Sequence, residues 1–198
     1  NWLVSVLASR ASIVLFDGSP MYKSEDLLLK IAERENITLF GVSAKYIDAL
    51  RKSKANLKYK YKLSKLRTIC STGSPLSKDG FRYIYKNIKK DVHLSSISGG
   101  TDIVSCFVLG NLYQPVILGE IQNKGLGLDV DIFNERGKSL KNKKGELVCK
   151  NPFPSMPLKF WNDKNDIKFR SAYFNNYQNI WHHGDYAEIK KSGGFIIH

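Results

Sequence analysis

The chain has 198 residues, of which 31 are Lys or Arg and 18 are Asp or Glu, so its formal net charge is +13. Hydrophobic residues make up 42% and aromatic residues 12%, and a chain this apolar can offset its loss of conformational entropy by burial, which excludes an intrinsically disordered protein. The basic excess suggests a nucleic acid, an anionic lipid or a phosphorylated ligand, but it consists of 24 Lys against 7 Arg, and Arg is the residue favoured for bidentate phosphate and base contacts.

The cysteines and the apolar runs argue against several further classes of protein. Cys70, Cys106 and Cys149 are odd in number and widely separated, which argues against a disulfide framework or a zinc site and favours a reducing compartment, so we expect a cytoplasmic protein. The longest apolar runs fall far short of the ~20 residues of a membrane span. The chain begins at Asn1 without Met, and we expect it to be a fragment.

The first half of the chain alternates strand and helix signals. Apolar runs predict strands at 12–17, 38–42, 67–71 and 92–97, and capping residues with helical periodicity predict helices after Ser24 and near 44–53 and 78–88. Ser24 is expected to cap the first of these helices. Such alternation is typical of a mostly parallel sheet covered by helices, whose ligands bind beyond the carboxyl ends of the strands.

The pattern changes near residue 115, where apolar alternation around Gly-containing turns predicts short antiparallel hairpins at 130–149 and 186–198. The predicted fold class is therefore α/β, with an α/β subdomain at 1–114 followed by a β-rich antiparallel subdomain at 115–198.

Two glycine-rich loops follow predicted strands, at 71–75 (STGSP) and 96–102 (SISGGTD). Glycine lets a ligand approach the backbone closely. In the second loop, the Thr101 hydroxyl can donate to a phosphate oxygen, and the Asp102 carboxylate can hold the magnesium that neutralises that phosphate. Taken alone, the Gly-Gly-Thr-Asp sequence favours a structural turn over a ligand site. A P-loop lysine pattern is missing, which argues against a simple P-loop enzyme.

The sequence HHGDY at 182–186 admits a metal site or a turn. Neighbouring side chains of a strand point to opposite faces, so His182 and His183 cannot easily share one ion. We favour a glycine turn that presents Asp185 as an acceptor for sugar hydroxyls.

A basic segment, residues 45–67, carries nine Lys or Arg against the single acid Asp48, with Tyr46, Tyr59 and Tyr61 interleaved. Cations with stacking aromatics suit single-stranded nucleic acid. An exposed helix and loop of a Lys-rich protein have the same composition, and we favour this surface interpretation because no RNA-binding motif accompanies the segment.

Several strings, taken in order, resemble the adenylate-forming acyl-CoA synthetase superfamily, and within it most closely the ligases that act on acetoacetate. They are STGSPL, SISGGTDIVSCF, PVILGEIQ, GELVCKNPFPSMP, FW, AYF and WHHGD. The resemblance covers essentially the whole chain. It implies an enzyme that uses ATP and magnesium to form an acyl-adenylate from a carboxylate and then transfers the acyl group to coenzyme A.

The resemblance also implies roles for particular residues. Gly73, Ser74 and Pro75 would line the adenine, and Asp185 would accept hydrogen bonds from the ribose hydroxyls. The segment formed by Ser98, Gly99 and Gly100 would belong to the nucleotide site, with Thr101 at the α-phosphate and Asp102 at the magnesium; Thr101 and Asp102 are the expected catalytic residues.

Two departures from the superfamily pattern lead to further expectations. Relatives that use acetate have bulky aromatic residues before the Thr-carboxylate pair, where Ser98, Gly99 and Gly100 stand here. We therefore expect Gly99 to leave room for acetoacetate, with Thr72 and the segment around Val42 and Ser43 as pocket walls. Gly99→Trp should then shift preference toward acetate. The superfamily's phosphate loop and mobile C-terminal domain are expected to lie outside this chain, which alone should not adenylate; the alternatives are a truncated, inactive relative or a nucleic-acid-binding module.

Overall fold

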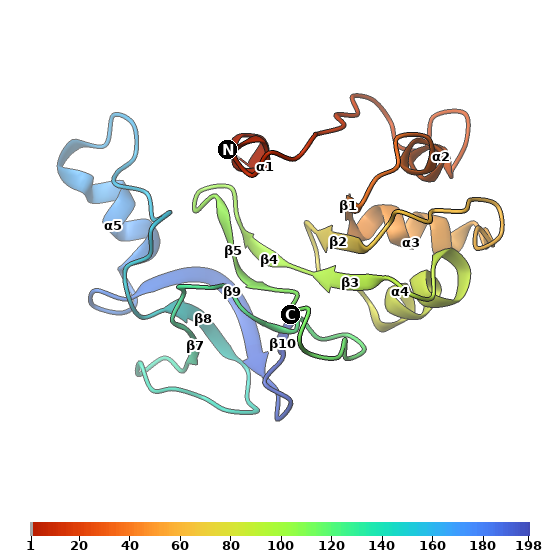
Figure 1. The fold of residues 1–198 in the computed structure, drawn as a ribbon. Helices are drawn as coiled ribbons and strands as arrows, with labels where there is room; N and C mark the ends of the chain where they lie inside the picture. Colours follow the sequence, from red (N-terminus) through yellow and green to blue (C-terminus); the bar gives the residue numbers. More distant parts are fainter. Residues whose placement is uncertain (1) are drawn as a thin grey trace. The chain divides into compact units, whose positions relative to one another are not determined.

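The computed structural model describes residues 2–198, except for the side chains of Trp2 and Val4. The chain divides into two compact units, Asn1–Ser96 and Ile97–His198 (Figure 1). The sequence places a subdomain division later, after residue 114. None of the helices in the described part of the chain has the length and apolarity that a membrane crossing requires.

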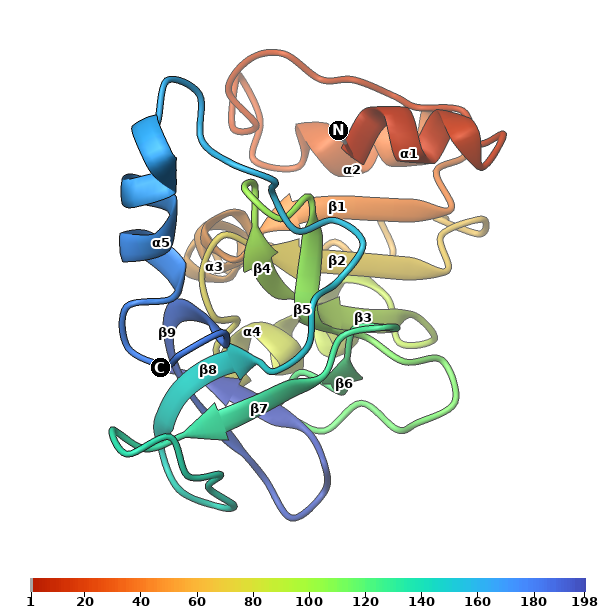
Figure 2. The ribbon, with the colours of Figure 1, turned by 90° about the vertical axis from the view of Figure 1, so that its left-hand side faces the viewer.

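The first unit contains a parallel three-stranded sheet with the order β1-β2-β3 (Figure 2). Its elements are α1 (Trp2–Ala8), α2 (Leu27–Arg34), β1 (Leu39–Ser43), α3 (Ala44–Lys52), β2 (Thr68–Thr72), α4 (Lys78–Tyr83), a π-helix (Ile84–Ile88) and β3 (His93–Ser96). The sequence therefore predicted these three strands and the helices between them correctly, and the α/β class is confirmed.

Capping side chains and buried apolar residues explain why this unit folds as it does. Ser43 ends β1 and also caps α3, because its hydroxyl accepts from the backbone N–H of Tyr46 at 3.1 Å. The strand consequently passes into the helix without a loop. Leu50 in α3, Ile69 in β2 and Leu94 in β3 are almost completely buried, and they contribute to the core of this unit.

The strand predicted at 12–17 is wrong, because this segment has no regular secondary structure. Val14, Leu15 and Phe16 are 44%, 71% and 41% exposed. A strand needs a neighbour to accept and donate its backbone hydrogen bonds, and within residues 2–198 no strand pairs with this segment. The apolar run indicated a preference for burial, which is not sufficient for a strand.

The second unit is built from two antiparallel sheets and one α-helix. The first sheet has the order β4-β5-β6, and the second has the order β10-β9-β8-β7. The elements are β4 (Ser98–Gly100), β5 (Ser105–Leu109), β6 (Asn123–Lys124), β7 (Val130–Phe133), β8 (Gly145–Cys149), a 3-10 helix (Lys164–Asp166), α5 (Ile167–Tyr173), β9 (Trp181–Ile189) and β10 (Phe195–Ile197). The two predicted hairpins are confirmed as β7–β8 and β9–β10. The β4–β5 hairpin was missed.

Aromatic rings dominate the core of the second unit. The proline-rich segment at 152–157 places Phe153 against Phe107 and Trp181, with ring centroids 5.6 and 5.5 Å apart in edge-to-face contact. Trp181, at the start of β9, is 2% exposed and also packs against Phe169 of α5. These contacts fix the start of β9, and β9 carries the HHGD sequence.

Candidate functional site

The loop at 71–75 leaves the carboxyl end of β2 and leads to α4. Gly73 has φ +82°, a conformation that favours glycine, and the space beside its Cα is open. Ser77 then caps α4 by accepting from the N–H of Gly80 at 3.1 Å. Ser74 and Pro75 line a cleft of about 550 Å³ together with side chains of α3. The loop is therefore accessible where the sequence predicts adenine contacts.

The predicted pocket walls of the first unit are neighbours at one edge of its sheet. In the parallel register, Val42 of β1 pairs with Ser71 of β2, and Ser43 pairs with Thr72. These pairs lie at the carboxyl ends of the two strands, the edge at which sheets of this kind bind ligands.

Gly99 has a different role from the one predicted. A Cβ at this position would collide with the carbonyl oxygen of Ser105 and lie 2.5 Å from the Cα of Cys106, both in the backbone of β5. Gly99 thus permits the close approach of β4 and β5 at a register irregularity. The missing side chain does not border open space, so the expectation that Gly99 leaves room for a substrate is corrected.

Gly100 leaves space for the carboxylate of Asp102. A Cβ at Gly100 would overlap Oδ1 of Asp102 and would lie 2.9 Å from Cε1 of His183. The other carboxylate oxygen, Oδ2, accepts a hydrogen bond from the Tyr173 hydroxyl at 2.6 Å. Asp102 is consequently held from two sides, by the glycine backbone of β4 and by a phenol at the end of α5.

Tyr173 is itself held by aromatic stacking. Its ring lies parallel to the indole of Trp181, with centroids 3.7 Å apart and an interplanar angle of 14°. Burial raises the pKa of Tyr173, and its hydrogen bond to Asp102 raises the pKa further. The phenol therefore stays protonated at neutral pH and donates to the carboxylate.

Thr101 and Asp102 lie in the turn between β4 and β5. Thr101 is exposed, and its carbonyl accepts from the N–H of Val104 at 3.3 Å. The described residues contain no group of three or more His, Cys, Asp or Glu side chains that could hold a metal ion. Magnesium that arrives with a nucleotide needs only one or two carboxylates besides the phosphates, so the donor set around Asp102 fits that use of the ion.

Asp185 lies next to Ser98, a residue 87 positions away in the sequence. The hydroxyl of Ser98 in β4 donates to Oδ2 of Asp185 in β9 at 3.1 Å. Gly184, just before it, has φ +85°, but it lies inside strand β9 at a register irregularity, so the predicted glycine turn is corrected to a glycine within a strand. The structure thus brings together two of the residues that the sequence predicted for the nucleotide site.

The two histidines have separate surroundings. Nδ1 of His182 lies 3.8 Å from Oε1 of Glu146, whereas the ring of His183 contacts Phe107 with centroids 4.7 Å apart. We therefore keep the interpretation in which the HHGD segment serves to present Asp185.

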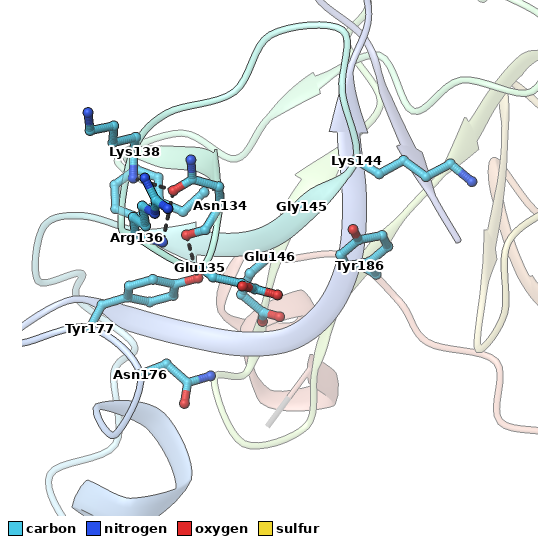
Figure 3. A pocket seen from close by; sticks show the side chains of 11 residues that line it. Asn134, Glu135, Arg136, Lys138, Lys144, Gly145, Glu146, Asn176, Tyr177 and Tyr186 are labelled. Carbon is cyan, nitrogen blue, oxygen red and sulfur yellow. Dashed lines mark hydrogen bonds between the residues drawn. The ribbon is translucent and has the colours of Figure 1, made fainter.

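A pocket of about 700 Å³ opens on the second unit (Figure 3). Its lining includes Glu146, Tyr177, Tyr186 and basic side chains such as Arg136 and Lys144, and none of its lining residues was predicted as a site residue. Glu146 is notable because it also accepts a hydrogen bond from the N–H of Gly184 at 2.7 Å.

Sequence reasoning missed both Tyr173 and Glu146. Both stand in strings that carry the superfamily resemblance, AYF and GELV, but no local pattern marks a lone tyrosine or glutamate as a partner of a distant carboxylate or turn. Their importance depends on contacts with residues 71 and 38 positions away.

Two of the three tyrosines in the basic segment at 45–67 make hydrogen bonds within the first unit, whereas most of its Lys and Arg side chains are exposed. Tyr46 is 6% exposed, and the Tyr61 hydroxyl donates to the carboxylate of Asp26 at 3.0 Å. Lys60 forms an ion pair with the same carboxylate. Of the three tyrosines, Tyr59 is left at 86% exposure, which weakens the case for a stacking platform for nucleic acid.

A family described as "AMP-binding enzyme" matches residues 1–157. The chain is 54% identical to an acetoacetyl-coenzyme A synthetase of Rhizobium meliloti and 46% identical to an acetoacetyl-CoA synthetase of Gallus gallus, in each case over all of this chain and 30% of the relative. A solved acetoacetyl-CoA synthetase from Streptomyces lividans superposes with a TM-score of 0.92 at 41% identity, over 99% of this chain and 31% of that one. The chain spans about 30% of the length of the curated relatives it matches.

Proposed function

Because the chain belongs to the family of AMP-binding enzymes, we propose that it is the nucleotide-binding portion of a ligase that activates acetoacetate. The complete protein would transfer the AMP group of ATP to the carboxylate of acetoacetate, which releases pyrophosphate and gives an acetoacetyl-adenylate. The thiol of coenzyme A would then take the acetoacetyl group and release AMP. The substrate follows from the names of the relatives that are 41–54% identical to this chain.

The observation that carries the proposal is the pair of carboxylates on the second unit. Asp185 is held by Ser98 at 3.1 Å, and Asp102 is held by Tyr173 at 2.6 Å. Preorganised groups need little rearrangement when a ligand arrives, which is the condition for strong electrostatic catalysis.

Each of the proposed site residues has chemistry that suits one part of the nucleotide. Asp185 accepts hydrogen bonds from the ribose hydroxyls, while Ser98 fixes the orientation of the carboxylate. The exposed hydroxyl of Thr101 donates to an oxygen of the α-phosphate. Gly73, Ser74 and Pro75 border the adenine in the first unit, and Gly99 and Gly100 shape the hairpin that carries Thr101.

Asp102 is the residue that would hold magnesium. Bound with the nucleotide, the ion would neutralise phosphate charge and act as a Lewis acid. The contribution of this chain is to orient the Asp102 carboxylate, through the hydrogen bond from Tyr173.

The test is exchange of labelled pyrophosphate into ATP by the complete protein whose reading frame contains this segment, with acetoacetate, acetate and butyrate compared. We expect acetoacetate to support the fastest exchange, and the 198-residue chain alone to support none. Thr101→Ala should slow exchange by about 10²-fold, as expected for the loss of one donor to the developing charge.

Other outcomes would identify the alternatives. Faster exchange with acetate or butyrate would refute acetoacetate as the substrate. No exchange with any acid by the complete protein would indicate a catalytically inactive relative that retains the fold.

A further inference from the structure

β9 is irregular where it passes Glu146. In the β8–β9 register, Glu146 pairs with Tyr186 and Val148 pairs with His182. Leu147 alone therefore lies opposite three residues of β9, at 183–185. An insertion of this kind is a β-bulge, which takes backbone groups out of the ladder and redirects side chains.

The bulge contains the predicted ribose acceptor and a glycine with positive φ. Gly184 has φ +85°, and its N–H donates to Oε1 of Glu146 at 2.7 Å. A carboxylate is a strong acceptor for a backbone N–H, so this hydrogen bond ties the bulge in β9 to the neighbouring strand β8. Asp185 is the next residue, and its backbone direction depends on the conformation of Gly184.

The side chain of Asp185 is held from another element. Ser98 of β4 donates to its Oδ2 at 3.1 Å, but this hydroxyl can orient the carboxylate only if the backbone of Asp185 stays in place. Glu146 supplies the backbone restraint, and Ser98 supplies the side-chain restraint. The two contacts together determine the position of the acceptor.

Glu146 contacts the bulge from the neighbouring strand. It projects from β8 beside the curved ribbon of β9, within the pocket of the second unit (Figure 3). Its side chain is 21% exposed, and its oxygen Oε1 faces both the N–H of Gly184 and Nδ1 of His182.

We propose that Glu146 is a positioning residue for ribose recognition, which acts by holding the Gly184 bulge so that Asp185 faces the nucleotide. This inference rests on the proposed function of Asp185 as the acceptor for the ribose hydroxyls. It adds to that function a residue on a different strand whose effect is specific to the sugar of the nucleotide.

The experiment measures discrimination between ATP and its 2′-deoxy and 3′-deoxy analogues by the complete protein, as the ratio of kcat/KM values in pyrophosphate exchange. Glu146→Met removes the acceptor and keeps the side-chain volume, whereas Glu146→Gln keeps an oxygen acceptor. Tyr186→Phe is the matched control, because Tyr186 lines the same pocket and none of the contacts in this argument uses its hydroxyl. Asp185→Ala reports the proposed ribose contact directly.

For the wild-type protein, we expect kcat/KM to be about tenfold higher with ATP than with the deoxy analogues, which is the effect of one hydrogen bond to a charged group. This ratio of kcat/KM values should fall close to one in Glu146→Met and Asp185→Ala. It should stay near the wild-type value in Glu146→Gln and Tyr186→Phe. The KM for acetoacetate should stay within about twofold in Glu146→Met, Glu146→Gln and Tyr186→Phe. A second acceptor-free variant, Glu146→Ala, provides the same comparison if Glu146→Met does not fold.

The possible failures are distinguishable. If Asp185→Ala loses the preference while Glu146→Met or Glu146→Ala keeps it, the role of Glu146 is refuted and the proposed function stands. Equal loss in Glu146→Gln and Glu146→Met would also overturn it, since the acceptor would not be the relevant feature. If the wild-type protein shows no preference, or Asp185→Ala keeps it, the ribose role of Asp185 fails and the inference fails with it.

Discussion

Replacing Asp26 by Asn removes a buried charge that links α2 to the basic segment at 45–67. Asp26 is 3% exposed, and its carboxylate accepts hydrogen bonds from Ser24 and Tyr61 and forms an ion pair with Lys60. Ser24 was expected to cap α2, but its hydroxyl donates to Asp26 instead. Burial alone would raise the pKa of Asp26; the hydrogen bonds from Lys60, Ser24 and Tyr61 outweigh it and lower the pKa from 3.8 to about 2.

The size of this shift determines the expected loss of stability. One pKa unit corresponds to 1.36 kcal/mol, so the ionised carboxylate contributes about 2 kcal/mol to the free energy of unfolding. Since the folded pKa lies below the unfolded one, this contribution is fully present above about pH 5. It disappears as the pH falls through about 4 to about 2.

The assay is urea unfolding followed by circular dichroism, for the wild-type protein and Asp26→Asn, at several pH values between 7 and 2. We expect a difference of about 2 kcal/mol at pH 7 that shrinks steadily below pH 4. Lys60→Met should reproduce part of the loss with the same pH dependence. A difference between wild type and Asp26→Asn that stays constant down to pH 2 would refute this reasoning, because the ionised form would then not be the stabilising one.

Two further substitutions test the site in the second unit. Gly99→Ala places a Cβ against the backbone of β5 and should lower the free energy of unfolding by about 1–3 kcal/mol. In the control Gly41→Ala, nothing lies within 4 Å of the new Cβ, so the free energy of unfolding should change by about 0.5 kcal/mol or less. Equal effects of the two substitutions in chemical denaturation would contradict the steric argument. Tyr173→Phe keeps the stacked ring but removes the hydrogen bond to Asp102, and should raise the magnesium concentration for half-maximal pyrophosphate exchange about tenfold. An unchanged magnesium requirement would show that the phenol does not orient Asp102.

The Gly99 result changes the interpretation of a substitution experiment suggested by the sequence. Gly99→Trp was expected to shift substrate preference toward acetate. In the structure, any side chain at this position first meets Ser105 and Cys106 of β5, so a loss of activity in Gly99→Trp would report a distorted hairpin. Gly99→Ala is the necessary companion, because it imposes the same backbone collision without a bulky ring.

The parts of the fold that the sequence predicted well are those in which local signals and burial agree. The strands predicted at 38–42, 67–71 and 92–97 correspond to β1, β2 and β3, with each end shifted by one residue. In the antiparallel part, the glycine turns marked both predicted hairpins. The segment at 12–17 shows the limit of this reasoning, since an apolar run becomes a strand only where another strand lies beside it.

By itself, the sequence determined the fold class and the chemistry of the candidate residues, because apolar periodicity, turn glycines and side-chain type are local properties. Only the tertiary structure decided what those residues contact. Ser98 meets Asp185 across 87 residues, and Tyr173 meets Asp102 across 71. The reason is physical: the orientation of a carboxylate is set by the hydrogen-bond donors that folding brings to it. No periodicity in the chain encodes those donors.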